Sequence, residues 1–432
     1  MNLPTRPRTV LFLIADTGAG HRSAANAIHR AMRMLNTGAD AAGQTPDWHV
    51  HIVDAIAECS RFPLRHGVFL YGPAITHSPQ LYGRLFHLTN SSVRFERAWR
   101  ACQPFVREGM RDLLERIRPD AIVSIHPLLN HITLQVLQDL RIHVPFITVV
   151  TDLVDVHCSW IAPRADACIV PTEQARQVAL AAGVSDRRVR LLGMPIDPAF
   201  AQPDPRPLAE RRRALGLDPA LRTVLIAGGG EGAGGLAESI SALARQPLDA
   251  QLVIVAGRNR QLYEEVRQMR FARRMPAHVF GFVDNMPALM RAADVVVTKA
   301  GPGTICEAIA CGLPILLTGA IPGQEEGNLD YVRESGLGEV ATTPAALVTA
   351  LRRLLQPADP RLAVWRENAR RHSHAGASLE IARFVLSLLP AVGAPSAWEA
   401  RPRQLPAPRL AGHGAGARLR RHSDVTVGVR GA

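Results

Sequence analysis

Short apolar runs alternate with longer amphipathic segments along the chain. The first run, Val10–Ala15, ends in a glycine-rich turn at 16–21, and a helical pattern follows from Ser23 to about Leu35. A short apolar run, a tight turn and a helix are typical of an α/β unit. Further strand-like runs lie at 49–53, 121–125, 146–151, 167–170 and 189–192, with helical segments such as 103–117 between them. We therefore expect parallel strands joined by right-handed crossovers.

The same alternation starts again in the second half of the chain. Strand-like runs return at 223–227, 251–256, 278–280, 295–298 and 315–317, and a glycine-rich turn at 228–235 follows the first of them. A stretch rich in proline and polar residues separates the two halves. We predict an N-terminal domain at 8–195, a linker at 196–221, a C-terminal domain at 222–377, a C-terminal helix at 378–392 and a disordered basic tail at 393–432.

Charge and cysteine usage narrow the class of protein. The formal net charge of +12 favours anionic partners such as phosphates, nucleic acids or acidic lipid surfaces. The basic excess is almost all arginine, and no nucleic-acid-binding signature accompanies it, so we expect no nucleic-acid partner. The six cysteines form no CxxC pair, and no apolar run is long enough for a signal-peptide core or a membrane span. We therefore expect a cytoplasmic protein with at most peripheral membrane contact.

The first glycine-rich turn ends in a histidine at a helix start. Gly18 and Gly20 allow a sharp turn and a close approach of a ligand to the backbone. His21 then lies at the carboxyl edge of a sheet, where ligands bind in such folds. The positive end of the helix lowers an imidazole pKa and keeps His21 neutral, as a general base must be. The alternative is a helix-capping turn with a solvated histidine.

The second half carries two further glycine-rich turns. The loop at 228–235 resembles a phosphate-binding turn but matches neither common fingerprint, so a simple tight turn remains open. The segment 298–308 places a Gly/Pro turn between a strand and a helix whose backbone N–H groups can hold a phosphate. Lys299, the single lysine of the chain, can add a point charge. Glu307 can accept the two hydroxyls of a ribose, although Thr304 and Glu307 also fit a capping box.

The segment Pro322–Asn328 carries side chains suited to a sugar. Gln324, Glu325 and Asn328 can bond several hydroxyls at once. Composition alone favours a surface loop with a helix start. The neighbouring phosphate-type turn makes a sugar site the stronger interpretation.

Seven motifs in order resemble one enzyme group. They are ADTGAGHRSAANAI, SIHPLLNHITL, VTDLVDVHCSW, GMPIDPAF, GGGEGAGG, GFVDNM and TKAGPGTICEAIACGLPILLTGAIPGQEEGN. Together they look like a GT-B glycosyltransferase of the monogalactosyldiacylglycerol synthase and processive diacylglycerol glucosyltransferase group, which is related to the N-acetylglucosaminyltransferase of the peptidoglycan lipid precursor. The resemblance covers residues 8 to 390. It departs at Ala19, where a third glycine is frequent.

This resemblance implies an α/β fold of two Rossmann-like domains that face each other across a cleft, with the C-terminal helix crossing back. It implies an inverting transfer of galactose or glucose from a UDP-hexose to diacylglycerol or a related lipid, with His21 as the base. The donor would meet Gly20, Gly229, Gly230, Glu231, Phe282, Val283, Lys299, Gly301, Gly303, Thr304, Glu307, Gln324, Glu325 and Asn328. The acceptor side would include His126, Asp152 and His157. Asp152 and Asp155 would line the cleft, and no metal or other cofactor would be required.

The segment Arg61–Trp99 mixes apolar, aromatic and basic residues and suits the surface of an anionic membrane. A helical subdomain with core-facing aromatics is the alternative. The resemblance places the acceptor side here and implies a peripheral protein on the cytoplasmic face of the membrane. A transferase with a soluble or peptidoglycan-type acceptor is the second enzyme hypothesis, and a sugar-nucleotide 2-epimerase shares the two-domain plan. The choice between galactose and glucose and the oligomeric state stay open.

Overall fold

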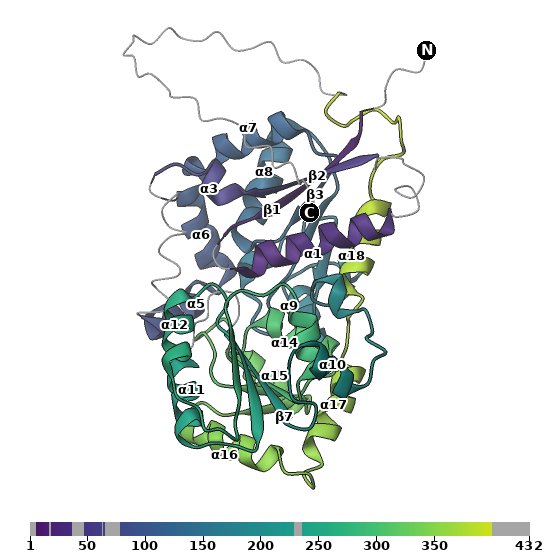
Figure 1. Cartoon of the computed structure of the whole chain (residues 1–432). Coiled ribbons are helices and arrows are strands. Elements are labelled where there is room, and N and C mark those ends of the chain that lie inside the picture. Colours follow the sequence, from purple (N-terminus) through teal and green to yellow (C-terminus); the bar gives the residue numbers. More distant parts are fainter. Residues whose placement is uncertain are drawn as a thin grey trace, which may run out of the picture.

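Two parallel sheets form the framework of the protein. The computed structural model describes residues 6–16, 19–36, 47–62, 64, 78–228 and 236–399. Each sheet has six strands, and every pairing between neighbouring strands is parallel. The two sheets lie in separate domains, one above the other in Figure 1. This is the GT-B arrangement that the resemblance implied.

The strand order places a switch point in each sheet. The N-terminal sheet runs β2-β1-β3-β4-β5-β6, and the C-terminal sheet runs β12-β11-β10-β7-β8-β9. Connections leave β1 and β3, and likewise β7 and β10, in opposite directions, which opens a crevice at their carboxyl ends. The strands are β1 (Arg8–Ile14), β2 (Trp48–Asp54), β3 (Ala121–Ser124), β4 (Phe146–Val149), β5 (Ala167–Val170), β6 (Val189–Leu191), β7 (Arg222–Ala227), β8 (Ala250–Val255), β9 (Ala277–Phe280), β10 (Val295–Thr298), β11 (Ile315–Leu317) and β12 (Gly338–Val340).

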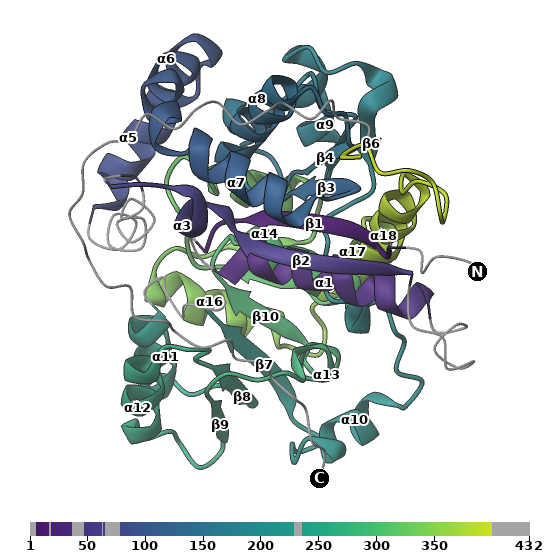
Figure 2. The same ribbon diagram turned by 90° about the horizontal axis from the view of Figure 1, so that it is seen from above.

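Helices cover both faces of each sheet (Figures 1 and 2). The central strands are buried on both sides, which is why they appear in the sequence as continuous apolar runs. The helices are α1 (Ala19–Leu35), α3 (Ala55–Cys59), α5 (Pro79–Thr89), α6 (Ser92–Cys102), α7 (Arg107–Ile117), α8 (Asn130–Leu140), α9 (Glu173–Ala181), α10 (Leu208–Ala214), α11 (Leu236–Arg245), α12 (Arg260–Gln268), α13 (Met286–Ala292), α14 (Pro302–Ala310), α15 (Glu326–Glu334), α16 (Pro344–Leu354), α17 (Arg361–Arg371) and α18 (Ala377–Ser387).

The C-terminal helix crosses back to the first domain, as expected. Ile381, Ala382 and Val385 of α18 pack in one core cluster with Ile28 and Met32 of α1. Figure 1 shows the two helices side by side. Because α18 follows the C-terminal domain in the chain, its apolar face ties the two domains together.

Residues 393–399 differ from the prediction of a disordered tail that begins at 393. Trp398 is buried in the core of the N-terminal domain, and its indole Nε1 donates to the Pro119 carbonyl at 2.8 Å. The Ser396 hydroxyl donates to Asp120 at 3.3 Å. The large apolar surface of Trp398 holds this segment against the N-terminal domain. The sequence around Trp398 has no hydrophobic periodicity, so it gave no sign of this contact. The basic residues from 401 onward lie outside the described residues.

The segment 196–221, predicted as a linker, contains a helix that packs on the second domain. Arg212 of α10 is buried and pairs with Asp294 at 2.6 Å, directly before β10. Asp294 also pairs with Arg222 and Arg366 at 3.1 Å each. The proline-rich composition indicated the boundary between the domains. It did not indicate that α10 packs on the second domain next to the start of β10.

Candidate active site

His21 lies in the first turn of α1, which begins at Ala19 rather than at Ser23. Its ring Nδ1 is 3.4 Å from the hydroxyl of Thr151, and its ring centroid is 4.9 Å from that of His126. Burial lowers the pKa of His21 to about 4, although a hydrogen bond to the Ile125 backbone and the charge of Asp16 act in the opposite direction. The imidazole is therefore neutral at pH 7 and able to accept a proton.

The two other histidines of this region are held as structural groups. His126 is buried, and its Nδ1 accepts the Leu128 N–H at 3.4 Å. His157 has both ring nitrogens engaged, with Nδ1 2.7 Å from the Ser159 hydroxyl and Nε2 3.2 Å from the Thr89 hydroxyl. Burial lowers the pKa of both rings. Their side chains line the same cavity as His21, and their bonds favour a positioning role.

Asp152 joins the two domains at the cavity. Its Oδ2 accepts the indole N–H of Trp160 at 2.6 Å, and its Oδ1 accepts the Gln324 amide at 3.5 Å. The hydroxyl of Tyr82, on α5, donates to the Gln324 Oε1 at 3.0 Å. Burial raises the pKa of Asp152 to about 6. Gln324, which comes from the second domain, is thus oriented by two residues of the first domain.

The loop at 321–327 is pressed against α5 and the segment 152–155. The Gly327 N–H donates to Asp155 at 2.5 Å, so Asp155 is a backbone partner across the domain boundary. A Cβ on Gly83 would lie 2.7 Å from the Cβ of Pro322, and one on Gly327 would lie 2.7 Å from Val154. Only glycine permits this approach of the two backbones. The sugar-type loop therefore sits directly on the acceptor side.

Lys299 and Glu325 form an ion pair that the sequence did not indicate. The ammonium lies 2.6 Å from Oε1 of Glu325, and Oε2 of the same carboxylate accepts the Ile321 N–H at 3.0 Å. Glu325 is buried. Asn328 is also buried, and its amide donates to the Ala300 carbonyl at 2.8 Å. These three side chains fix the turn at 299–301 to the start of α15. Their contacts with a donor stay predictions.

The start of α14 has the geometry of an anion site. The helix begins at Pro302 with Gly301 at its N-cap, and no side chain caps it. The N–H groups of Gly303 and Thr304 belong to the first turn, where an α-helix offers no carbonyl partner. A Cβ at Gly303 would meet no atom within 4 Å, so the turn faces open space. The proposed capping box of Thr304 and Glu307 is wrong, because Thr304 lies inside the helix.

Glu307 follows one turn later on the same helix. Burial raises the pKa of its carboxyl to about 8, and the charge of Asp197 acts in the same direction. A carboxyl that keeps its proton at pH 7 can both donate to and accept from hydroxyl groups. Phe282 follows β9 and is 64% exposed, and the Arg258 guanidinium carbon lies 5.2 Å from the centroid of its ring. Val283 is half-buried beside it. Gly229, Gly230 and Glu231 lie outside the described residues, and Gly20 is exposed on α1.

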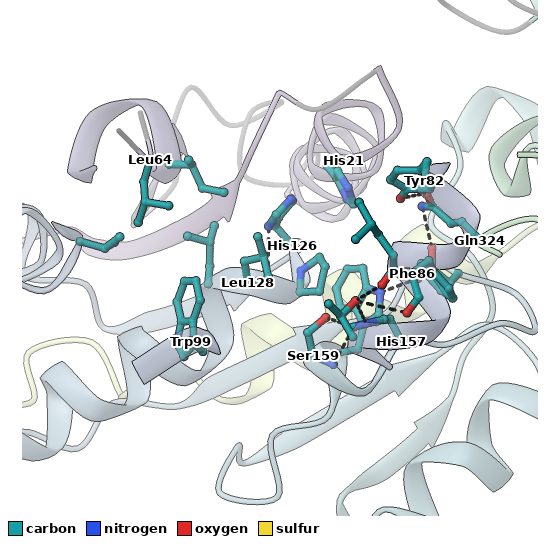
Figure 3. A pocket seen from close by; sticks show the side chains of 18 of the residues that line it. His21, Leu64, Tyr82, Phe86, Trp99, His126, Leu128, His157, Ser159 and Gln324 are labelled. Atoms are coloured by element: carbon teal, nitrogen blue, oxygen red, sulfur yellow. Dashed lines mark hydrogen bonds between the residues drawn. The ribbon is translucent and has the colours of Figure 1, made fainter. Parts of the chain in front are cut away.

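A cavity of about 450 Å³ lies beside His21, and His126, Asp152, His157 and Gln324 also line it. Lys299, Thr304, Glu307 and Phe282, expected to meet the donor, are not among its lining residues. Figure 3 shows His21, Tyr82 and Gln324 at one end and Leu64 and Trp99 at the other. Three groups that orient the polar end of the cavity were not among the predicted site residues, namely Tyr82, Thr151 and Trp160. Thr151 and Trp160 stand inside the quoted motif VTDLVDVHCSW, but only the folded chain shows what they bond.

Two further observations concern the described part of the chain. None of its helices has the length and apolar character needed to traverse a bilayer. Within the same residues, no three His, Cys, Asp or Glu side chains converge as candidate metal ligands. Asp152 and Asp155, expected to line the cleft, accept hydrogen bonds from Trp160, Gln324 and the Gly327 backbone.

Known proteins resemble the chain along most of its length. Residues 21–196 match the family model described as monogalactosyldiacylglycerol (MGDG) synthase, and residues 223–364 match the glycosyltransferase family 28 C-terminal domain. The chloroplastic monogalactosyldiacylglycerol synthase of Spinacia oleracea is 33% identical over 387 residues, which cover 88% of this chain and 72% of the spinach protein.

Solved structures support the fold. MurG of Acinetobacter baumannii aligns with a TM-score of 0.56 at 14% identity, over 88% of this chain and 100% of that one. A putative UDP-N-acetylglucosamine 2-epimerase of Listeria monocytogenes aligns with a TM-score of 0.51 at 15% identity, over 86% and 94%. The fold by itself therefore does not separate a transferase from an epimerase, whereas the sequence relatives do. By its family model and its relatives, the chain belongs to the monogalactosyldiacylglycerol synthase family.

Proposed function

We propose that this protein transfers a hexose from a UDP-sugar to the hydroxyl of diacylglycerol or a related membrane lipid, with inversion at the anomeric carbon. The observation that carries the proposal is that one cavity is lined by neutral His21, by the sugar-type residue Gln324 and by a long, mainly apolar wall. A polar acceptor would not need the apolar wall, and an epimerase would not need an acceptor cavity at all. The names of the relatives favour galactose as the sugar.

In the proposed reaction, the acceptor hydroxyl lies against His21 at the polar end of the cavity. Its oxygen forms a bond to the anomeric carbon as its proton moves to the imidazole. The bond between that carbon and the diphosphate oxygen breaks, and UDP leaves from the opposite face of the sugar. An α-linked donor then gives a β-linked glycolipid.

The leaving diphosphate gathers negative charge at the start of α14. The N–H groups of Gly303 and Thr304 and the positive end of this helix would stabilise it. Glu307 would bond the ribose hydroxyls, and the backbone at Phe282 and Val283 would meet the uracil. No metal or other cofactor enters this scheme. We therefore expect EDTA to leave the transfer rate unchanged.

We place the protein on the cytoplasmic face of a membrane through α5 and its surroundings. Leu81, Leu85 and Leu88 lie on one face of α5 and are about half exposed, at 57%, 49% and 55%. Arg84 and His87 lie exposed between them. An apolar stripe bordered by cations is typical of a helix that binds an anionic lipid surface.

A donor panel tests the proposed function. Purified protein is given diacylglycerol in anionic liposomes with UDP-galactose, UDP-glucose or UDP-N-acetylglucosamine, and the lipid products are resolved by mass. We expect a hexosyl-diacylglycerol from UDP-galactose, with NMR showing a β linkage. Binding of UDP without a lipid product from any donor would reject the acceptor and favour a soluble or peptidoglycan-type one.

A further inference from the structure

The cavity beside His21 changes in polarity along its length. His157 and Gln324 lie on the side of His21 that faces away from Leu64 in Figure 3, and Asp152 is bonded to Gln324. The opposite end is formed by Leu64 and Trp99, which belong to the same core cluster as Ile56 and Val106 (Figure 3). One polar end and one long apolar end match a hydroxyl group that is joined to a hydrocarbon chain.

The size of the cavity limits how much hydrocarbon it holds. A methylene group takes up about as much space as one water molecule in the liquid, roughly 30 Å³. The volume of about 450 Å³ therefore holds on the order of 15 such groups. This is the space of the acceptor glycerol together with most of one long acyl chain, and it leaves no room for a second chain.

The cavity also has a route to the lipid-facing surface. Leu85 lines the cavity and is 49% exposed on the same face of α5 as Leu81 and Leu88. Leu85 therefore connects the exposed apolar stripe of α5 with the cavity. Phe86, the next residue, also lines the cavity and lies against Gly323 of the donor-side loop.

We infer that this cavity binds a single acyl chain of the acceptor, while the second chain stays outside against the exposed face of α5. The inference rests on the proposed function, and it adds how the lipid is recognised. One long chain is then sufficient for efficient transfer, and the length of that chain sets the rate. The glycerol hydroxyl is brought to His21 because the inserted chain anchors it.

The test compares acceptors in detergent micelles with the intact protein. The acceptors are a glycerol with one sixteen-carbon and one two-carbon acyl chain, one with two sixteen-carbon chains, and one with two four-carbon chains. We expect the first two to react with kcat/KM values within about threefold of each other. We expect the third to react at least a hundredfold more slowly, because each buried methylene contributes about fourfold.

A variant that fills the apolar end makes the test specific. Val106 is buried and lines the cavity, and Val106→Phe adds a ring where the chain would end. We expect the ratio of kcat/KM for sixteen-carbon over eight-carbon chains to fall at least tenfold. Val136→Phe makes the same change in the same core cluster but outside the cavity lining. Any loss of folded protein cancels in this ratio, so the control should keep the wild-type value.

A binding measurement separates this inference from the proposed function. Trp99 and Trp160 line the cavity, so a monoacylglycerol with a brominated chain should quench tryptophan fluorescence. In Val106→Phe, the concentration needed for half-maximal quenching should rise at least tenfold. An unchanged chain-length ratio in folded Val106→Phe, or a strict need for two long chains, would overturn the acyl cavity while the transferase function stands. Quenching without any hexosyl-lipid product would instead refute the proposed function.

Discussion

The ion pair between Lys299 and Glu325 provides the most quantitative prediction. Lys299→Met removes the only side-chain cation that contacts Glu325 within the described residues. The carboxylate would keep the hydrogen bond from the Ile321 N–H at 3.0 Å. Its side chain is 5% exposed, so water cannot replace the lost ammonium. Breaking a buried pair from one side costs about 3 to 5 kcal/mol.

The expected magnitude lies at the lower end of this range. Lys299 is 22% exposed, so part of its environment is aqueous in the folded protein. We expect Lys299→Met to lower the free energy of unfolding of the second domain by about 3 kcal/mol, which corresponds to a melting temperature roughly 6 to 12 °C lower. The double variant Lys299→Met/Glu325→Gln should recover most of this loss, because it leaves no buried charge.

Two assays on the same variants separate stability from donor binding. Thermal unfolding measures the first, and calorimetric titration with UDP measures the second. If Lys299 also contacts the diphosphate, the double variant regains its melting temperature but binds UDP about tenfold or more weakly, as loss of a charged hydrogen bond implies. An unchanged melting temperature in Lys299→Met, or a double variant no more stable than the single one, would refute the reasoning.

Four further predictions follow from the site. His21→Ala should keep UDP affinity but lower turnover by about 10² to 10⁴, and full activity by product assay would remove His21 as the base. Glu307→Ala should weaken UDP itself about tenfold in calorimetry, since the ribose contact does not depend on the sugar; unchanged affinity would contradict that role. Burial raises the pKa of Glu307 from 4.5 to about 8, so the folded protein holds a proton that the unfolded chain loses across this window. The stability that Glu307 supplies is thus lost as the pH rises, and the free energy of unfolding of Glu307→Gln relative to the wild type should increase between pH 5 and 8 by up to about 1.4 kcal/mol per unit in denaturant titrations; a flat difference would speak against the raised pKa. Tyr82→Phe removes a hydrogen bond to Gln324 and should raise the KM for the donor several-fold while UDP affinity stays the same; an equal loss for UDP would point to a general disturbance of the loop.

The strands were the most predictable part of the fold. Runs such as Val10–Ala15 and Val295–Val297 are apolar at every position because both faces of a parallel strand are covered by helices. The strand β12 escaped prediction, because it is a three-residue edge strand whose sequence, Gly338–Val340, contains glycine and glutamate. The start of α1 was also placed too late, since alanine and glycine carry no periodic signal.

The sequence by itself determined the kind of site. Three features of the sequence indicated a sugar-nucleotide site. They are the glycine before His21, the Gly/Pro turn at 301–303 and the carboxamides near 324. The bonding partners of these side chains lie far apart in the chain, so no local sequence pattern reveals them. The pairing of Lys299 with Glu325, the seating of Gln324 between Tyr82 and Asp152, and the burial of Trp398 all arose from packing. The cavity beside His21 is the clearest case, since its wall combines residues of α3, α5 and α6 with loop residues that lie far apart in the chain. Local periodicity fixes where a side chain points on its own element, whereas the space between elements exists only once they have packed together.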